Sequence, residues 1–117
     1  GLPMNPMIVD GQIQGGFAQG FSVAIGERLI HDREGQLLTG SLMDYYLPRA
    51  EDIPEIELNH VRFPTKDNPL GIKSVGESGP NAPPATMASA IEDALEGALE
   101  VTRLPITQSD ILGALRA

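Results

Sequence analysis

The residue best suited to chemistry in this sequence is Glu77, which sits between glycines in the stretch Gly71-Ile-Lys-Ser-Val-Gly-Glu-Ser-Gly79. Glycine neighbours leave room for a substrate or cofactor to reach the carboxylate. Partial removal of water raises the pKa of a glutamate toward the range of a working general base. The alternative is a solvated loop carboxylate beside a serine and a lysine, and the stretch taken alone favours that alternative.

A second candidate is the stretch Gly11-Gln-Ile-Gln-Gly-Gly-Phe-Ala-Gln-Gly20, where glycines and glutamines open a predicted helix. Glycines at a helix start let backbone N–H groups meet an anionic ligand, and a glutamine amide both donates and accepts hydrogen bonds. The alternative is that the pairs Gly11/Gly15 and Gly16/Gly20 only allow close helix packing, which the stretch by itself favours. The spacing differs from the dinucleotide-binding GxGxxG fingerprint.

Composition disfavours several other classes of site and partner. The chain has 117 residues and a formal net charge of −8. It has no cysteine, which excludes thiolate metal sites and cysteine nucleophiles. Its 8 Lys and Arg residues are scattered and make no footprint for nucleic acid. His31 and His60 are isolated, so no metal site built from side chains is expected. No stretch of apolar residues is long enough to predict a membrane span.

The elements that must position these residues indicate an α+β fold in one domain. Asp10 is predicted to cap a glycine-rich helix over about 11–27, because apolar residues recur there at steps of three and four. Two short apolar runs around a glycine turn predict a β-hairpin over 29–39, with 41–47 prolonging its second strand. Alternating polar and apolar residues over 55–63 predict a further, half-buried strand.

The second half of the chain is predicted to hold a loop and two helices. Residues 64–84 show no period and are rich in glycine and proline, so the stretch around Glu77 is expected to be a loop. A C-terminal amphipathic helix is predicted over 86–101, with two prolines suited to its first turn. Thr107 or Ser109 is predicted to start a last short helix.

Three stretches that follow each other along the chain resemble one known family. They are Asn5-Pro-Met-Ile-Val-Asp-Gly-Gln-Ile-Gln-Gly-Gly-Phe-Ala-Gln-Gly20, Gly40-Ser-Leu-Met-Asp-Tyr-Tyr-Leu-Pro48 and Asn68-Pro-Leu-Gly-Ile-Lys-Ser-Val-Gly-Glu-Ser-Gly79. Together they resemble the C-terminal end of the molybdenum-binding large subunit in the xanthine dehydrogenase/aldehyde oxidase/carbon monoxide dehydrogenase family. Each motif alone has low specificity, but the three occur in the family's order across nearly the whole chain.

The resemblance implies a cofactor and roles for five residues. Family members bind molybdopterin, often as its cytosine dinucleotide, and oxidise aldehydes, N-heterocycles or carbon monoxide with oxygen derived from water. The glutamate of the family's Gly-Val-Gly-Glu motif is the general base, which maps to Glu77, and Gln12 maps to a cofactor-contacting position. Ser74, Val75 and Gly76 map to backbone beside the molybdenum, although the family usually has glycine where Ser74 stands. The pterin's dithiolene sulfurs hold the metal, so the resemblance implies no metal ligand from this chain.

The resemblance also implies that residues 1–117 are a single C-terminal segment of a molybdopterin-binding domain, because family subunits are several times longer. Its partners would be the remainder of the molybdenum-binding subunit and the subunits that carry the iron–sulfur clusters and FAD, in a cytoplasmic complex. The isolated chain is therefore expected to bind no cofactor firmly and to turn over nothing. The alternative is a non-catalytic remnant or interaction module that retains the fold.

Overall fold

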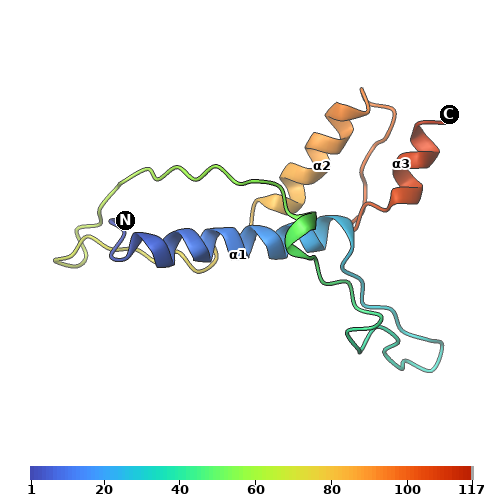
Figure 1. Ribbon diagram of the computed structural model, residues 1–117, viewed down its shortest axis with the longest axis horizontal. Helices are drawn as coiled ribbons and strands as arrows, with labels where there is room; N and C mark the ends of the chain where they lie inside the picture. Colours follow the sequence, from blue (N-terminus) through green and yellow to red (C-terminus); the bar gives the residue numbers. More distant parts are fainter. Residues whose placement is uncertain (117) are drawn as a thin grey trace.

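Helix α1 (Pro6–Ile25) is the longest element of the computed structural model, which describes residues 1–116 (Figure 1). The elements that follow it are the 3₁₀ turn η1 (Ala50–Asp52) and the helices α2 (Pro83–Ala94) and α3 (Gln108–Ala114). α2 packs against α1, and long segments without regular structure join the elements. The chain is elongated, with extents of 55 × 39 × 26 Å, so α1 is the support on which the loops are arranged.

α1 begins at Pro6, before the predicted start, because Asn5 and Pro6 together form the stronger start signal. The Asn5 Oδ1 atom accepts a hydrogen bond from the Ile8 N–H at 3.3 Å. A proline in the first turn costs the helix no hydrogen bond, because the N–H that proline lacks would have no partner within the helix there. The prediction that Asp10 caps this helix is therefore wrong, since Asp10 lies inside it, whereas the end at Ile25 is close to the predicted one.

The predicted β-hairpin over 29–39 has the right turn but not the predicted strands. In the described chain the arms form one antiparallel bridge, between His31 and Leu37, and Gly35 takes a positive φ of 83° in the turn between them. The Leu and Ile side chains of both arms stay 36% to 67% exposed, so no packing supports a longer ladder. Residues 41–45 form bends and turns, and the predicted extension of the second strand is wrong as well.

The segment 55–63 is extended, but no strand of the described chain lies beside it, so the predicted strand has no ladder. The alternation of polar and apolar residues shifts by one position at Asn59 and His60, where two polar residues follow each other. Before this shift the apolar side chains are half-buried, and after it they are exposed, at 90% for Val61 and 73% for Phe63. Such a shift turns side chains to the opposite face of a strand. The regular structure of residues 1–116 is therefore almost entirely helical, and the α+β class is right only in its helices.

α2 runs over Pro83–Ala94 rather than over the predicted 86–101. It starts earlier because its two prolines occupy the first turn, as expected for residues that lack an N–H. It ends earlier because Glu96 and Gly97 take positive φ values of 52° and 79°, a left-handed conformation that terminates helices. The existence of the helix is confirmed, and its predicted last two turns are wrong.

α3 confirms the predicted last helix, and of the two predicted starts, Thr107 and Ser109, it is Thr107 that caps it. The Thr107 hydroxyl oxygen accepts from the Asp110 N–H at 3.2 Å, and the Asp110 carboxylate accepts from the Thr107 N–H at 2.8 Å. The hydroxyl and then the N–H of Thr107 hold the pKa of the Asp110 carboxyl below its usual value, with a smaller contribution from Arg103. None of the helices in the described part of the chain is both long and apolar enough to cross a membrane.

The small core lies at the C-terminal end of α1. Phe21, Ala24 and Ile106 are buried there, with 8%, 0% and 4% of their surfaces exposed. The Ile106 N–H donates to the Ala24 carbonyl at 2.8 Å, which ties the segment before α3 to the end of α1. This end of the molecule is therefore the better packed one.

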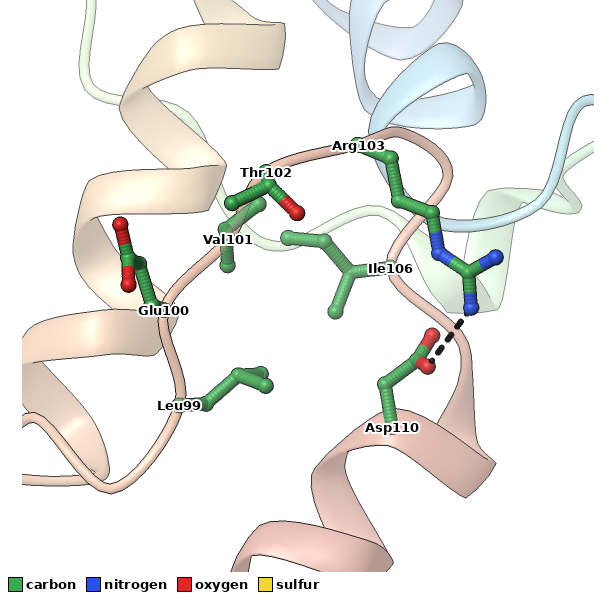
Figure 2. A pocket seen from close by; sticks show the side chains of 7 residues that line it. All are labelled: Leu99, Glu100, Val101, Thr102, Arg103, Ile106 and Asp110. Atoms are coloured by element: carbon green, nitrogen blue, oxygen red, sulfur yellow. Dashed lines mark hydrogen bonds and ion pairs between the residues drawn. The ribbon is translucent and has the colours of Figure 1, made fainter.

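A cavity of about 200 Å³ lies beside this core, between the segment that follows α2 and the start of α3 (Figure 2). It is lined by Leu99, Glu100, Val101, Thr102, Arg103, Ile106 and Asp110. The ion pair between Arg103 and Asp110, at 3.2 Å, borders it. None of the residues predicted to do chemistry lines this cavity, so the candidate site lies elsewhere.

Candidate functional site

Two glycines of α1, Gly16 and Gly20, allow the loop that carries Glu77 to pack closely against the helix. A Cβ atom built on Gly16 would lie 2.7 Å from the Gly79 Cα, and one built on Gly79 would lie 2.7 Å from the Gly16 Cα. Backbone therefore lies directly on backbone, which side chains at these positions would prevent. Gly20 makes a similar contact, since its Cβ would lie 2.8 Å from the Pro80 carbonyl oxygen. For the pair Gly16/Gly20 the close-packing interpretation is right.

Gly11 and Gly15 are different, because no atom of the described chain packs closely against them, although Gly15 lines an open cavity with Tyr45 and Leu47. A Cβ on either would meet no heavy atom within 4 Å, so packing among residues 1–116 does not explain them. A glycine inside a helix costs roughly 0.5–1 kcal/mol relative to alanine, and no contact here offsets that cost. The open backbone at these two positions is a surface that a ligand or another chain could approach closely.

Gln12 joins the two glycine-rich stretches. Its Nε2 atom donates a hydrogen bond to the Gly76 carbonyl oxygen at 3.1 Å, across 64 positions of sequence. The bond places the Gln12 amide beside the peptide that leads into Glu77. Two residues predicted for the site are therefore in contact, and the predicted base is the next residue along the chain.

Glu77 lies exposed in a tight turn, in which the Ser78 N–H donates to the Val75 carbonyl at 3.0 Å. None of the ion pairs within residues 1–116 involves its carboxylate. Gly76 is open as well, since a Cβ built on it would meet no heavy atom within 4 Å. The turn therefore presents a free carboxylate next to an accessible peptide, and any burial of that carboxylate must come from atoms outside the described chain.

Ser74 and Val75 line a cavity of about 220 Å³ that does not include Gly76 or Glu77. Its other walls come from the N-terminal segment, from α1 and from residues 59–61, together with Lys73 and Ser78. The structure thus brings Gln12, Gly76 and Glu77 together and places the remaining two predicted residues on the wall of a neighbouring cavity.

Two contacts around the site are not predicted from the sequence, one within the turn that precedes the Glu77 loop and one between α1 and the segment 59–61. Asn68 Oδ1 accepts from the Leu70 and Ile72 N–H groups at 3.2 Å each, and Asn68 Nδ2 donates to the Ile72 carbonyl at 3.0 Å. The Asn-Pro pair that opens this turn is a usable local signal. Asp10 Oδ1 lies 2.6 Å from His60 Nε2, and the two residues are 50 positions apart, so no local pattern reveals their contact.

Replacing Gln12 with alanine is expected to loosen the turn around Glu77. An amide–carbonyl hydrogen bond contributes about 0.5–1.5 kcal/mol, so exchange of the Ser78 amide, which is bonded to the Val75 carbonyl in this turn, is expected to become roughly 2- to 12-fold faster. Hydrogen–deuterium exchange measures this rate directly. Gln14→Ala is the matched control, because Gln14 is an exposed glutamine of the same helix, whereas the hydrogen bond to Gly76 comes from Gln12. Equal exchange rates in the two variants would show that the bond does not restrain the turn.

Comparison with known proteins adds the family. A model of the molybdopterin cofactor-binding domain matches residues 1–54. The chain is also 42% identical over 94 residues to the carbon monoxide dehydrogenase large chain of Hydrogenophaga pseudoflava, a match that covers 80% of this chain and 12% of that protein. The chain belongs to the family of molybdenum-binding large subunits. The family predicted from the three sequence stretches is therefore confirmed.

Two further relatives match nearly the whole chain. The nicotine 6-hydroxylase large subunit of Paenarthrobacter nicotinovorans is 37% identical, over 99% of this chain and 14% of its own length. The crystal structure of quinoline 2-oxidoreductase from Pseudomonas putida 86 superposes with a TM-score of 0.90 at 40% identity, over 99% of this chain and 15% of its own. The chain thus spans between 12% and 15% of the length of these three relatives.

The residues present fit the molybdopterin cofactor of this family. Among residues 1–116, no three His, Cys, Asp or Glu side chains gather closely enough to hold a metal ion. Molybdopterin does not require them, because the resemblance implies that its own sulfurs bind the metal. What the described chain offers is the Gln12 amide and backbone that no side chain covers at Gly11, Gly15 and Gly76, which a cofactor could approach closely. Because α1 begins at Pro6, Gly11 and Gly15 lie inside the helix, and their N–H groups are not the free donors that the sequence predicted for a helix start.

Proposed function

We propose that this chain forms one wall of the molybdenum centre in an enzyme that oxidises an aldehyde, an N-heterocycle or carbon monoxide with oxygen derived from water. In this proposal Glu77 is the general base, and Gln12, Ser74, Val75 and Gly76 contact the cofactor. The hydrogen bond from Gln12 to Gly76, at 3.1 Å, carries the proposal. It joins the stretch that resembles the family's cofactor-contacting motif to the stretch that resembles its base motif.

The chain's own contribution to the reaction is a positioned proton acceptor. When bound, the molybdenum cofactor supplies the redox chemistry. The Glu77 carboxylate takes up a proton from the water-derived oxygen as that oxygen attacks the substrate, a role that accelerates reactions by about 10²–10⁴-fold. Gln12 restrains the peptide that precedes Glu77, and Gly76 leaves space beside the carboxylate for the reacting groups.

The rest of the site comes from outside these residues. Because the chain spans 12% to 15% of three relatives, we assign the substrate pocket and the remaining cofactor contacts to the remainder of the large subunit. One relative is named as a subunit of a dehydrogenase complex, which supports an assembly of several chains. We assign the iron–sulfur clusters and FAD to partner subunits of a cytoplasmic complex. The cofactor bound at this site is molybdopterin or its cytosine dinucleotide.

Expression of the chain with and without the rest of its complex tests the proposal. The 117-residue chain alone is expected to purify without molybdenum and to oxidise no substrate. The same residues within the assembled enzyme are expected to accompany molybdenum in a one-to-one ratio, with turnover. Elemental analysis and a dye-reduction assay with an aldehyde, an N-heterocycle and carbon monoxide measure both. An assembled enzyme without molybdenum would identify the chain as a non-catalytic interaction module, and an active isolated chain would refute the shared site.

A further inference from the structure

The backbone of residues 53–64 makes no hydrogen bond to any other backbone group of the described chain. The groups on either side do, since the Asp52 N–H donates to the Arg49 carbonyl at 2.9 Å and the Thr65 N–H to the Gly71 carbonyl at 3.3 Å. Figure 1 shows the segment as a long open arc that runs from η1 back past α1 toward the N-terminal end of that helix. Extended backbone of this kind presents a row of free N–H and C=O groups, the template to which another strand adds.

The side chains of this segment carry apolar groups on both faces. Ile56 and Leu58 are half-buried on the described chain. Val61 and Phe63, after the shift in alternation, are 90% and 73% exposed. A strand with apolar residues on both faces is typical of a sheet that is covered on both sides. The Lys73 Nζ atom lies over the Phe63 ring, 5.4 Å from its centroid, but the ring stays largely exposed. Most of the apolar surface of Val61 and Phe63 is therefore left uncovered by residues 1–116.

The segment 53–64 is also restrained near both of its ends by side-chain contacts. Near its C-terminal end, His60 Nε2 lies 2.6 Å from Asp10 Oδ1 of α1. Just before its N-terminal end, the Asp52 carboxylate accepts from the Arg49 N–H at 2.8 Å and fixes η1. Restraints at both ends lower the conformational entropy that is lost when a strand pairs, which strengthens binding without new contacts.

We propose that residues 55–63 form a β-strand that pairs with a strand supplied by the remainder of the large subunit. The pairing is strand addition, in which main-chain hydrogen bonds give affinity and the alternate side chains give register. The choice of partner rests on the proposed function, because the chain spans only 12% to 15% of its relatives. A second copy of this chain is the poorer partner, since each copy carries a formal charge of −8 and the two would repel each other.

Hydrogen–deuterium exchange on the large subunit tests the pairing. The amides of residues 55–63 are compared in the 117-residue chain alone and in the same chain assembled with the rest of the subunit. In the isolated chain they are expected to exchange at the rate of unprotected amides. In the assembly, alternate or all amides are expected to slow by about 100-fold or more. Unchanged fast exchange in the assembly would overturn the proposal, as would protection that comes with dimers of the isolated chain.

Proline substitutions supply a second test at two exposed positions, Glu57 and Arg62. Successive N–H groups point to opposite edges of a strand, so one of Glu57→Pro and Arg62→Pro removes an N–H that faces the partner. That variant is expected to recover at least 10-fold less of the rest of the subunit in co-purification. The controls Glu57→Thr and Arg62→Thr keep the N–H and are expected to co-purify normally. Normal co-purification of both proline variants would overturn the pairing.

A failure of the strand-pairing proposal can be told apart from a failure of the proposed function. Neither amide protection nor co-purification depends on turnover or on Glu77. If Glu77 is not the base, Glu77→Gln stays active while residues 55–63 are still protected in the assembly. If the strand does not pair, the protection is missing while Glu77→Gln still loses activity.

Discussion

Replacing Glu77 with glutamine in the assembled enzyme is expected to lower kcat by about 10²–10⁴-fold, the usual contribution of a positioned general base. Glutamine keeps the shape of the side chain, but its amide does not take up a proton at neutral pH. The molybdenum content is expected to stay unchanged, because the exposed Glu77 carboxylate takes part in no ion pair that holds the loop within residues 1–116. Steady-state kinetics and metal analysis of one preparation measure both quantities.

Glu34→Gln is the matched control for that experiment. Glu34 is also an exposed glutamate in a tight turn, where its N–H donates to the Asp32 side chain at 3.0 Å, and it lies outside the three stretches that resemble the family. Its substitution is expected to change neither kcat nor the molybdenum content. An unchanged kcat in Glu77→Gln would remove Glu77 from the mechanism, and a loss of molybdenum would reassign it to cofactor binding.

Local sequence signals are sufficient where a helix end depends on a few neighbouring residues. α3 starts at the predicted Thr107 because the hydroxyl and Asp110 satisfy each other's backbone N–H groups within one turn. The glycine-rich helix also forms, but it begins at Pro6 rather than near Gly11, since Asn5 and Pro6 are a stronger start than Asp10, and it ends at Ile25, close to the predicted end. These signals concern the backbone of adjacent residues, so they do not depend on the rest of the fold.

The strands are a different case, because a ladder needs a second strand that local pattern does not supply. The alternation in 55–63 indicates which side chains are apolar enough to be buried by a neighbouring element. The apolar runs on either side of the turn at Gly35 indicate the same for the hairpin. The described chain provides neither a partner for the first nor packing for the second. For residues 55–63 the sequence therefore predicts extended backbone correctly and a hydrogen-bonded strand incorrectly, whereas over 41–45 the chain forms bends and turns instead of the predicted strand.

The members of the candidate site are predictable by residue type and order, but their contacts are not. Gln12 and Glu77 follow from the resemblance, whereas the bond from Gln12 to Gly76 spans 64 positions and depends on how the loop sits on α1. The contact between Asp10 and His60 is equally remote in sequence. Nor does the sequence separate the glycines of α1 into those that pack and those that stay open, since all look alike in the pattern.

That separation predicts opposite effects for two adjacent substitutions. Gly16→Ala is expected to lower the free energy of unfolding of the chain by about 1–3 kcal/mol, the usual range for an overpacked site. Its Cβ would lie 2.7 Å from the Gly79 Cα and 2.7 Å from the Pro80 Cδ, so backbone and a rigid ring would have to move. Gly15→Ala is expected to raise the free energy of unfolding by roughly 0.5–1 kcal/mol, because alanine favours the helix and its Cβ meets nothing within 4 Å. Urea titrations of the two variants measure the difference.

The same pair separates the packing and ligand interpretations of the glycine-rich helix within the assembled enzyme. Gly16→Ala displaces the loop that carries Glu77, so kcat is expected to fall along with the stability of the chain. Gly15→Ala leaves that loop in place, and a loss of molybdenum from a more stable chain would show that the cofactor approaches the open backbone at Gly15. If Gly15→Ala instead retains its molybdenum, the cofactor does not use that backbone, and the glycine there serves a contact with another part of the large subunit. If Gly16→Ala proves as stable as the original chain, the close contact of Gly16 with Gly79 is not what holds the loop against α1.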